Sequence, residues 1–166
     1  MSEFALARVW RFGDQVDTDQ LAPGRYIKGS IDELAAHCLE ALRPEFAGAV
    51  RPGDLVVAGI GFGIGSSREQ AAQTLRLLGV GAVIAGGAAR IFYRNAINLG
   101  LPVLLCTDTE MLVDGAIVRL DLDSGKVFDA SGAILARCEP MQPFLRQIVR
   151  DGGLIANLKL RLARPA

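Results

Sequence analysis

Two serines, an arginine and a glutamate, at positions 66 to 69, follow four alternating glycines at positions 59, 61, 63 and 65. Glycine is favoured where the backbone adopts unusual dihedral angles or must approach another group closely. A helix that begins after such a loop gathers free backbone N–H groups and the positive end of the helix dipole, and both favour an anion. The guanidinium of Arg68 can bind a carboxylate through two parallel hydrogen bonds. This stretch therefore predicts an anion site.

The glycine spacing does not fit the two common nucleotide-binding motifs. A dinucleotide fingerprint needs glycines at relative positions 1, 3 and 6, and a Walker loop needs a lysine after its last glycine, where this chain has Ser66. A capping box with Ser66 as the N-cap residue and Glu69 at the third helical position explains only those two side chains. We expect this capping box to form, and the glycines, Ser67 and Arg68 to serve recognition.

Nucleophilic catalysis by the chain alone is poorly supported. A serine hydroxyl is too weak an acid to act as a general base unless local electrostatics favour its anion. The lone histidine, His37, lies in a predicted helix far from the serines, and we expect it to be a surface or packed side chain. A hydrolase triad therefore lacks its base.

The elements around this stretch predict a mixed α/β fold. The apolar runs 55–58, 80–85 and 102–106 read as buried strands, and helices at 69–78 and 88–99 separate them, which predicts a βαβαβ unit with parallel strands. We expect a strand at 4–12 and a helix capped by Ser30 before this unit. After it, the sequence predicts short antiparallel strands at 116–122, 126–128 and 133–138, and a last helix from 140 or 141 to 150 that ends at Gly152-Gly153.

The composition indicates one ordinary globular domain, residues 1–166. Hydrophobic residues make up 51% and charged residues 22%, and 18 basic residues balance 18 acidic ones, so no global field favours nucleic acid or an acidic membrane. The chain shows neither a signal-peptide layout nor an apolar stretch of membrane-spanning length, so we expect a cytoplasmic protein. The three cysteines are far apart and predict neither disulfides nor a metal site.

Three blocks of sequence resemble one family. Residues 63–70, Gly-Ile-Gly-Ser-Ser-Arg-Glu-Gln, closely resemble the signature of the swivelling domain of the aconitase superfamily, in particular the small subunits of 3-isopropylmalate isomerase (dehydratase) and homoaconitase. The residues Asp17-Thr18-Asp19 and Pro23-Gly24-Arg25-Tyr26 resemble the N-terminal block of that family, and residues 88–102 resemble its third block. The blocks agree in order and spacing over nearly the whole chain. The resemblance implies a three-layer β/β/α domain with a mixed sheet.

The resemblance also implies a composite active site. In this family, a large subunit carries a [4Fe-4S] cluster, and the pair dehydrates and rehydrates hydroxy di- or tricarboxylates, as in leucine biosynthesis. By residue-by-residue transfer, Ser66 would be the base that removes the proton beside a carboxylate, and Ser67 and Arg68 would bind substrate carboxylates. Asp19 would be the acidic partner of a large-subunit group near the leaving hydroxyl. Lys28 would lie in the loop that selects the variable end of the substrate.

Two residues depart from the family pattern. The family usually has Cys where Ile64 stands and His where Gln70 stands. Lys28 suggests a polar or acidic substituent, so related dehydratases of dimethylmalate, citraconate, maleate or homoaconitate stay open beside a 3-isopropylmalate enzyme. The alternative of another class is a non-catalytic, carboxylate-binding swivelling domain. The joint presence of Ser66, Arg68 and Asp19 favours the enzyme.

Overall fold

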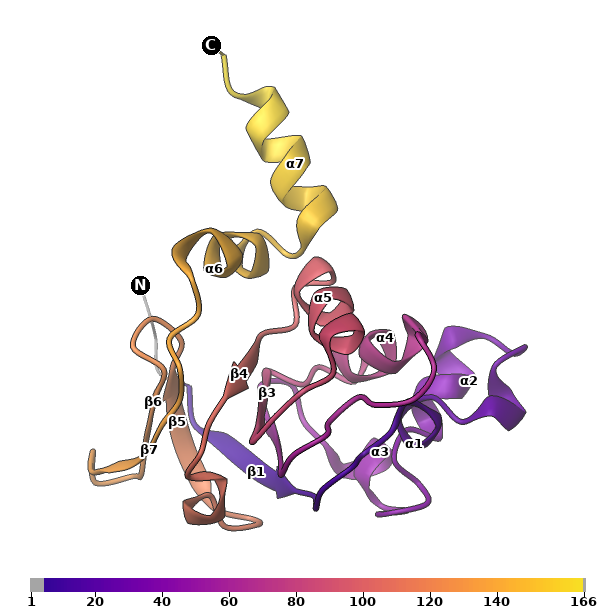
Figure 1. Ribbon diagram of the computed structural model, residues 1–166, viewed down its shortest axis with the longest axis horizontal. Coiled ribbons are helices and arrows are strands. Elements are labelled where there is room, and N and C mark those ends of the chain that lie inside the picture. The colour runs from indigo at the N-terminus through magenta and orange to yellow at the C-terminus, as the bar shows by residue number, and fades with distance from the viewer. Residues whose placement is uncertain (1–4, 166) are drawn as a thin grey trace.

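The computed structural model describes residues 5–165 of the chain, in which strands alternate with helices and then give way to a hairpin region (Figure 1). The strands are β1 (Ala7–Arg11), β2 (Leu55–Ala58), β3 (Ala82–Ala85), β4 (Val103–Leu105), β5 (Ile117–Asp121), β6 (Lys126–Phe128) and β7 (Ile134–Arg137). The α-helices are α1 (Thr18–Leu21), α2 (Ile31–Ala36), α3 (Phe46–Ala49), α4 (Gln70–Leu77), α5 (Arg90–Asn98), α6 (Pro143–Arg150) and α7 (Leu154–Ala163). The 3-10 helices are η1 (Gly24–Tyr26) and η2 (Thr109–Met111).

Strands β1 to β4 form the parallel part of the sheet. Every residue of β2 and β3 is buried, which is typical of strands that are covered on both faces. Val56 of β2 lies opposite Val83 of β3, and Ile84 of β3 lies opposite Leu104 of β4. Helix α4 connects β2 to β3, and α5 connects β3 to β4. The predicted βαβαβ unit is therefore present.

Strand β1 joins the parallel part of the sheet to an antiparallel part. On one edge β1 runs parallel to β2, with Val9 opposite Leu55, and on the other it runs antiparallel to β5, with Ala7 opposite Val118. Strands β6 and β7 continue the antiparallel part. The strand order is β4-β3-β2-β1-β5-β6-β7, which confirms the predicted mixed sheet.

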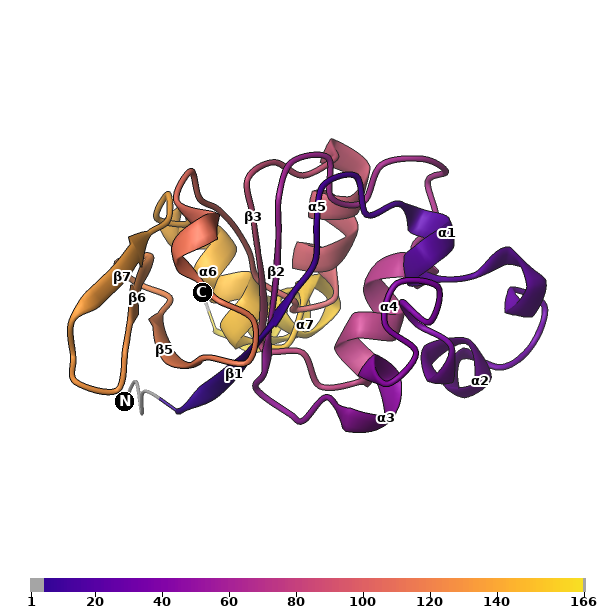
Figure 2. The same cartoon turned by 90° about the horizontal axis from the view of Figure 1, so that it is seen from below.

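Two separate cores lie on the two faces of the parallel strands, because successive residues of a strand point in opposite directions. Val56 packs in one core with residues of α1 to α5, such as Leu75 of α4. Its neighbour Leu55 packs in the other core with Val118 and Val127 of the antiparallel strands. Helices α1 to α4 gather on one side of β1 and β2, and the hairpin strands lie on the other (Figure 2). The fold is the expected three-layer β/β/α arrangement.

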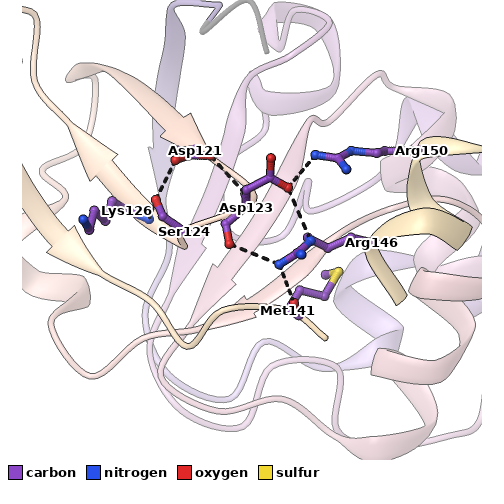
Figure 3. A network of polar contacts seen from close by, with 7 residues as sticks. All are labelled: Asp121, Asp123, Ser124, Lys126, Met141, Arg146 and Arg150. Atoms are coloured by element: carbon purple, nitrogen blue, oxygen red, sulfur yellow. Dashed lines mark hydrogen bonds and ion pairs between the residues drawn. The ribbon is translucent and has the colours of Figure 1, made fainter. Parts of the chain in front are cut away.

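The turn between β5 and β6 fastens helix α6 through a polar network (Figure 3). Arg150 Nη2 donates a hydrogen bond to Asp123 Oδ1 at 2.5 Å, and Arg146 Nε lies 3.3 Å from the same oxygen. Arg146 Nη1 also donates to the backbone carbonyls of Asp123 and Met141, at 3.1 and 3.0 Å. Helix α6 is therefore fixed to the antiparallel strands, and it packs against α5 on its other side.

Helices α1, α3 and α7 were not predicted from the sequence. The glycines at 152 and 153 do end α6, but the chain then resumes as α7, which leads away from the body of the molecule (Figure 1). Ile155 and Leu162 of α7 are 65% and 86% exposed, so this helix lacks the buried apolar stripe that identifies an amphipathic helix in a sequence. The predicted start of the first strand, Phe4, lies outside the described residues.

Candidate active site

The loop between β2 and α4 is held on both sides by neighbouring segments at the carboxyl ends of the parallel strands. On one side, Gly63 N–H donates to the Val16 carbonyl at 2.7 Å, and the Ile64 carbonyl accepts from Thr18 N–H at 2.9 Å. On the other side, the carbonyl of Phe62 accepts from Ala89 N–H at 2.8 Å. These contacts attach the glycine-rich loop to the segments that follow β1 and β3. A loop fixed in this way can present the residues after it in a defined position.

Two of the alternating glycines are required by close packing. Gly63 has a φ angle of +78°, and a Cβ atom there would lie 2.4 Å from Cβ of the buried Phe92 on α5. Gly65 has a φ angle of +105°, and its Cβ would lie 3.1 Å from the Thr18 hydroxyl. Both positions combine a left-handed backbone with a near neighbour, which only glycine accepts readily. The loop therefore approaches α1 and α5 closely on its way to the serines.

Ser66 and Ser67 lie exposed in an irregular segment before α4, and the predicted capping box is absent. Helix α4 begins at Gln70, its N-cap residue is Glu69, and no side chain caps it. The Ser66 carbonyl accepts a hydrogen bond from Arg68 N–H at 2.8 Å, so a tight turn replaces the first helical turn. The capping-box prediction was wrong, because the contacts of Arg68 with α1 hold this segment in a non-helical conformation.

Arg68 connects this segment to α1. Its Nη1 donates to Asp19 Oδ1 at 2.8 Å and to the Ala22 carbonyl at 2.9 Å. Asp19 Oδ1 also accepts from Gly24 N–H at 2.9 Å. Since the carboxylate receives both the guanidinium and a backbone N–H, the pKa of Asp19 is lowered, mainly by the hydrogen bond from Arg68. Asp19 is therefore an anion at neutral pH.

The short helix α1 sets the position of Asp19. Asp17 is its N-cap residue and forms a capping box with Gln20: Asp17 Oδ1 accepts from Gln20 N–H at 2.8 Å, and Gln20 Oε1 accepts from Asp17 N–H at 3.0 Å. This places Asp19 in the first turn, with its side chain 68% exposed, whereas that of Arg68 is 27% exposed. The cap at Asp17 therefore fixes the first turn of α1, from which Asp19 contacts Arg68.

Lys28 lies in the turn after η1, exposed to solvent. The loop that carries it begins at Gly24, whose N–H binds Asp19, so Lys28 belongs to a segment that is attached to the Asp19–Arg68 pair. A Cβ at Gly24 would lie 3.1 Å from Asp19 Oδ1 and 3.5 Å from Arg68 Nη2, so glycine also permits this close approach. Sequence reasoning named Gly24 within the N-terminal block but missed its contact with Asp19 and the contact of the Ala22 carbonyl with Arg68, because a backbone group carries no sequence signal.

The five predicted site residues thus form one connected region. Asp19 and Arg68 are in direct contact, Ser66 and Ser67 precede Arg68 in the chain, and Lys28 lies on the attached loop. The region carries a guanidinium that contacts one exposed carboxylate, and two exposed serines and an exposed lysine lie on the segments attached to this pair. This arrangement can bind an anionic substrate that carries more than one carboxylate.

Arg90 and Arg94, on α5, line a different site. They border a groove of about 500 Å³ between α5, α6 and β4, whose other walls include Tyr93, Leu145 and Ile148. None of the five predicted site residues lines this groove. The pKa of Tyr93 is raised by burial and by the nearby negative charge of Glu139.

The described residues do not fit a metal cluster. Cys38 packs in the core on the helical side, whereas Cys106 and Cys138 pack in the core on the hairpin side, and all three are buried. Over residues 5–165, no group of three His, Cys, Asp or Glu side chains is placed to hold a metal ion. Burial raises the pKa of Cys38 to about 12, so this thiol is not a ready anionic ligand.

Among residues 5–165, none of the helices has both the length and the apolar character needed to cross a membrane.

The chain is similar to proteins of one family over nearly all of its length. Residues 44–107 match the family model described as the aconitase C-terminal domain. The chain is 52% identical over 157 residues to the methanogen homoaconitase small subunit of Methanothermobacter thermautotrophicus, with 93% of this chain and 91% of that protein covered. It is 47% identical over 154 residues to the 3-isopropylmalate dehydratase small subunit of Halothermothrix orenii, with 92% and 93% covered. The crystal structure of 3-isopropylmalate dehydratase from Methanocaldococcus jannaschii superposes with a TM-score of 0.87 at 42% identity, and covers 95% of this chain and 94% of that chain.

Proposed function

We propose that this chain, which belongs to the family of 3-isopropylmalate dehydratase and homoaconitase small subunits, is the small subunit of a heteromeric hydro-lyase. The enzyme dehydrates and rehydrates a hydroxy di- or tricarboxylate of the 3-isopropylmalate type. The observation that carries this proposal is the contact of Arg68 with Asp19 beside the exposed Ser66 and Ser67. It brings residues from two distant sequence blocks to one surface.

Ser66 is the proposed base. Loss of water from a hydroxy acid removes a proton from the carbon beside a carboxylate and the hydroxyl from the neighbouring carbon. Negative charge then develops on that carboxylate, and the Arg68 guanidinium is placed to bind it together with the Ser67 hydroxyl. Rehydration reverses these steps with the hydroxyl on the other carbon.

The exposure of Ser66 explains why a partner is needed. In water, a serine hydroxyl holds its proton far too firmly to act as a base at neutral pH. A large subunit that covers this edge would exclude water and strengthen the field of Arg68 at the hydroxyl, because charges interact more strongly at low dielectric constant. Asp19, whose side chain is 68% exposed, would be the acidic partner of a group of that subunit near the leaving hydroxyl. We therefore expect the isolated chain to be inactive.

We assign the [4Fe-4S] cluster of the enzyme to the large subunit. The described part of this chain offers no ligand set for it, since its cysteines are buried in two different cores. The roles proposed for Ser66, Ser67, Arg68 and Asp19 concern the proton and the carboxylates, and these side chains belong to this chain.

Lys28 is proposed to select the substrate. Its side chain is exposed on the loop attached to Asp19, which supports a role in contacting the substituent of a substrate whose carboxylates are bound by Arg68. A cation favours a polar or acidic substituent over an apolar one, so homoaconitate is a substrate to test beside 3-isopropylmalate. We further propose that residues 1–166 form one swivelling domain of a cytoplasmic enzyme.

The test is reconstitution with the large subunit. The chain is co-purified with the product of an adjacent large-subunit gene, the cluster is rebuilt without oxygen, and turnover of hydroxy acids is followed by the absorbance of the enoate. Ser66→Ala should abolish turnover and leave assembly intact, whereas Ser131→Ala, in the turn between β6 and β7, should leave turnover unchanged. Turnover by the Ser66 variant at the wild-type rate would remove Ser66 as the base. No stable partner and no turnover of any hydroxy acid would favour the non-catalytic binding domain.

A further inference from the structure

The loop that carries Lys28 is fastened at a second point, by stacked aromatic rings. The ring of Tyr26, two residues before Lys28, lies parallel to the imidazole of His37, with 3.6 Å between the ring centroids and 7° between the planes. The Arg25 guanidinium lies 5.3 Å from the centroid of the same Tyr26 ring. Aromatic rings in water more often meet edge to face or offset. The imidazole and the guanidinium therefore both restrict the position of the Tyr26 ring.

His37 is itself held in orientation. Its Nδ1 lies 2.6 Å from Glu40 Oε2, within hydrogen-bond distance. His37 is also the C-cap residue of α2, where its backbone N–H donates to the carbonyls of Leu34 and Ala35. Both the backbone and the ring of His37 are therefore fixed by α2 and the turn that follows it.

The loop is thus attached to the active site at one end and to α2 at the other. At its start, Gly24 N–H binds Asp19, which binds Arg68. At Tyr26, the stack attaches it to α2, and α2 packs against α4, the helix that follows the Ser66 segment. Between Tyr26 and Ser30, Gly29 N–H donates to the Tyr26 carbonyl at 3.0 Å, which closes the turn that contains Lys28.

We propose that the stack of Tyr26 on His37 sets the position of Lys28 relative to Arg68, which makes His37 a positioning residue for substrate selection. This inference rests on the proposed function, because Lys28 selects a substrate only if the chain serves a hydro-lyase. His37 touches no reacting atom. Its effect passes through Tyr26 to the loop, so loss of the ring should alter which substituent is accepted more than the rate of proton removal.

The experiment measures discrimination by the reconstituted holoenzyme. The ratio of kcat/KM for homoaconitate to kcat/KM for 3-isopropylmalate is compared in wild type, His37→Ala and His37→Phe. His37→Ala should change this ratio at least about fivefold, mainly through KM, with kcat within about twofold. His37→Phe keeps a flat ring for the stack and should retain the wild-type ratio. If the alanine variant discriminates like the wild type, the inference is overturned.

Two controls separate positioning from general loss of stability. Gly53→Ala strains a turn before β2, far from this loop in sequence, and should lower Tm without altering the ratio. In the double variant His37→Ala with Lys28→Ala, the ratio should equal that of Lys28→Ala alone, because His37 acts through Lys28. Additive effects of the two substitutions would contradict the inference.

The stack is also testable without activity. In the isolated chain, the Tyr26 ring protons should show upfield NMR shifts that are lost in His37→Ala and kept in His37→Phe. A wild-type holoenzyme that turns over no hydroxy acid would refute the proposed function while these shifts still show the stack. Unshifted Tyr26 protons in an active wild-type enzyme would refute the inference alone.

Discussion

Replacing Gly63 with alanine should destabilise the fold through two effects that the structure separates. The backbone at Gly63 has a φ angle of +78°, and holding a residue with a Cβ in the left-handed region costs roughly 1–2 kcal/mol. The new Cβ would lie 2.4 Å from both Cβ and Cγ of Phe92, which is 2% exposed and packs edge-on against Phe62 at 5.1 Å between ring centroids. Overpacking of a filled core costs about 1–3 kcal/mol. The sum is about 2–5 kcal/mol, which lowers Tm by roughly 4–20 °C in a protein of this size.

Matched glycine variants isolate the two contributions in a thermal unfolding assay by circular dichroism. Gly53 has a φ angle of +93°, and a Cβ added there would meet nothing within 4 Å, so Gly53→Ala should show the backbone cost alone. Gly13 has neither a left-handed backbone nor a near neighbour, so Gly13→Ala should stay within about 0.5 kcal/mol of wild type. If Gly63→Ala loses no more stability than Gly53→Ala, Phe92 does not obstruct this position and the proposed packing cost is refuted.

Three further predictions concern buried and charged groups. Asp54 is 7% exposed and accepts from an indole N–H and two backbone N–H groups, so Asp54→Asn should cost roughly 1–3 kcal/mol in urea unfolding, and the exposed Glu110→Gln should cost little. The pKa of Asp19 is lowered in the folded state, so the pairing of Asp19 with Arg68 adds stability above the unfolded pKa near 3.8, and this stability is lost as the pH falls through the folded pKa. Carboxyl 13C NMR should show the pKa of Asp19 rising in Arg68→Gln, because the main cause of its lowering is removed. An unchanged pKa in this variant would contradict the ion pair. Burial raises the pKa of Cys38 to about 12, so iodoacetamide at pH 8.5 should leave Cys38 unmodified in the folded chain. The same reagent should alkylate Cys38 when the chain is unfolded in guanidinium. Rapid alkylation of Cys38 in the folded chain would show that the thiol is accessible, contrary to this prediction.

The strands and the helices between them could be predicted from the sequence because their patterns are local. Apolar runs such as 55–58 and 82–85 are buried on both faces, and helix-length segments separate them, so periodicity and connection rules suffice. Lys126–Phe128 was predicted with its observed bounds because the Asp123-Ser124-Gly125 turn marks where it starts. Ser30 caps α2 as expected, with its hydroxyl accepting from Glu33 N–H at 3.1 Å.

The errors arise where distant contacts decide the local conformation. Ser66 and Glu69 have the spacing of a capping box, but hydrogen bonds from Arg68 to Asp19 and to the Ala22 carbonyl hold the segment outside the helix, which starts only at Gln70. No local pattern reveals a bond between residues that lie so far apart in the chain. The roles of the five site residues came from a family resemblance rather than from spacing, and they stay predictions until the variants are assayed.

Helix α7 was missed for a different reason. Recognition of a helix in a sequence depends on an apolar stripe that packs against a core, and α7 instead exposes its one isoleucine and several of its leucines. Its helical conformation is compatible with residues of high helix propensity, such as Leu, Ala, Lys and Arg, but that preference is a weak signal beside a pair of glycines.

The central place of β1 in the sheet has a consequence for biosynthesis on the ribosome. Of the described strands, β1 is translated first. Val9 pairs with Leu55 and Ala7 pairs with Val118, so neither edge of β1 can pair until later parts of the chain have been synthesised. One edge of β1 therefore stays unpaired until β5 has left the exit tunnel, even after β2 has paired with the other edge, and unpaired strand edges are prone to association. Because these pairings are long in sequence, closing the sheet at β1 should be a slow, late step of folding. Chaperones that protect exposed strands would find this segment during synthesis.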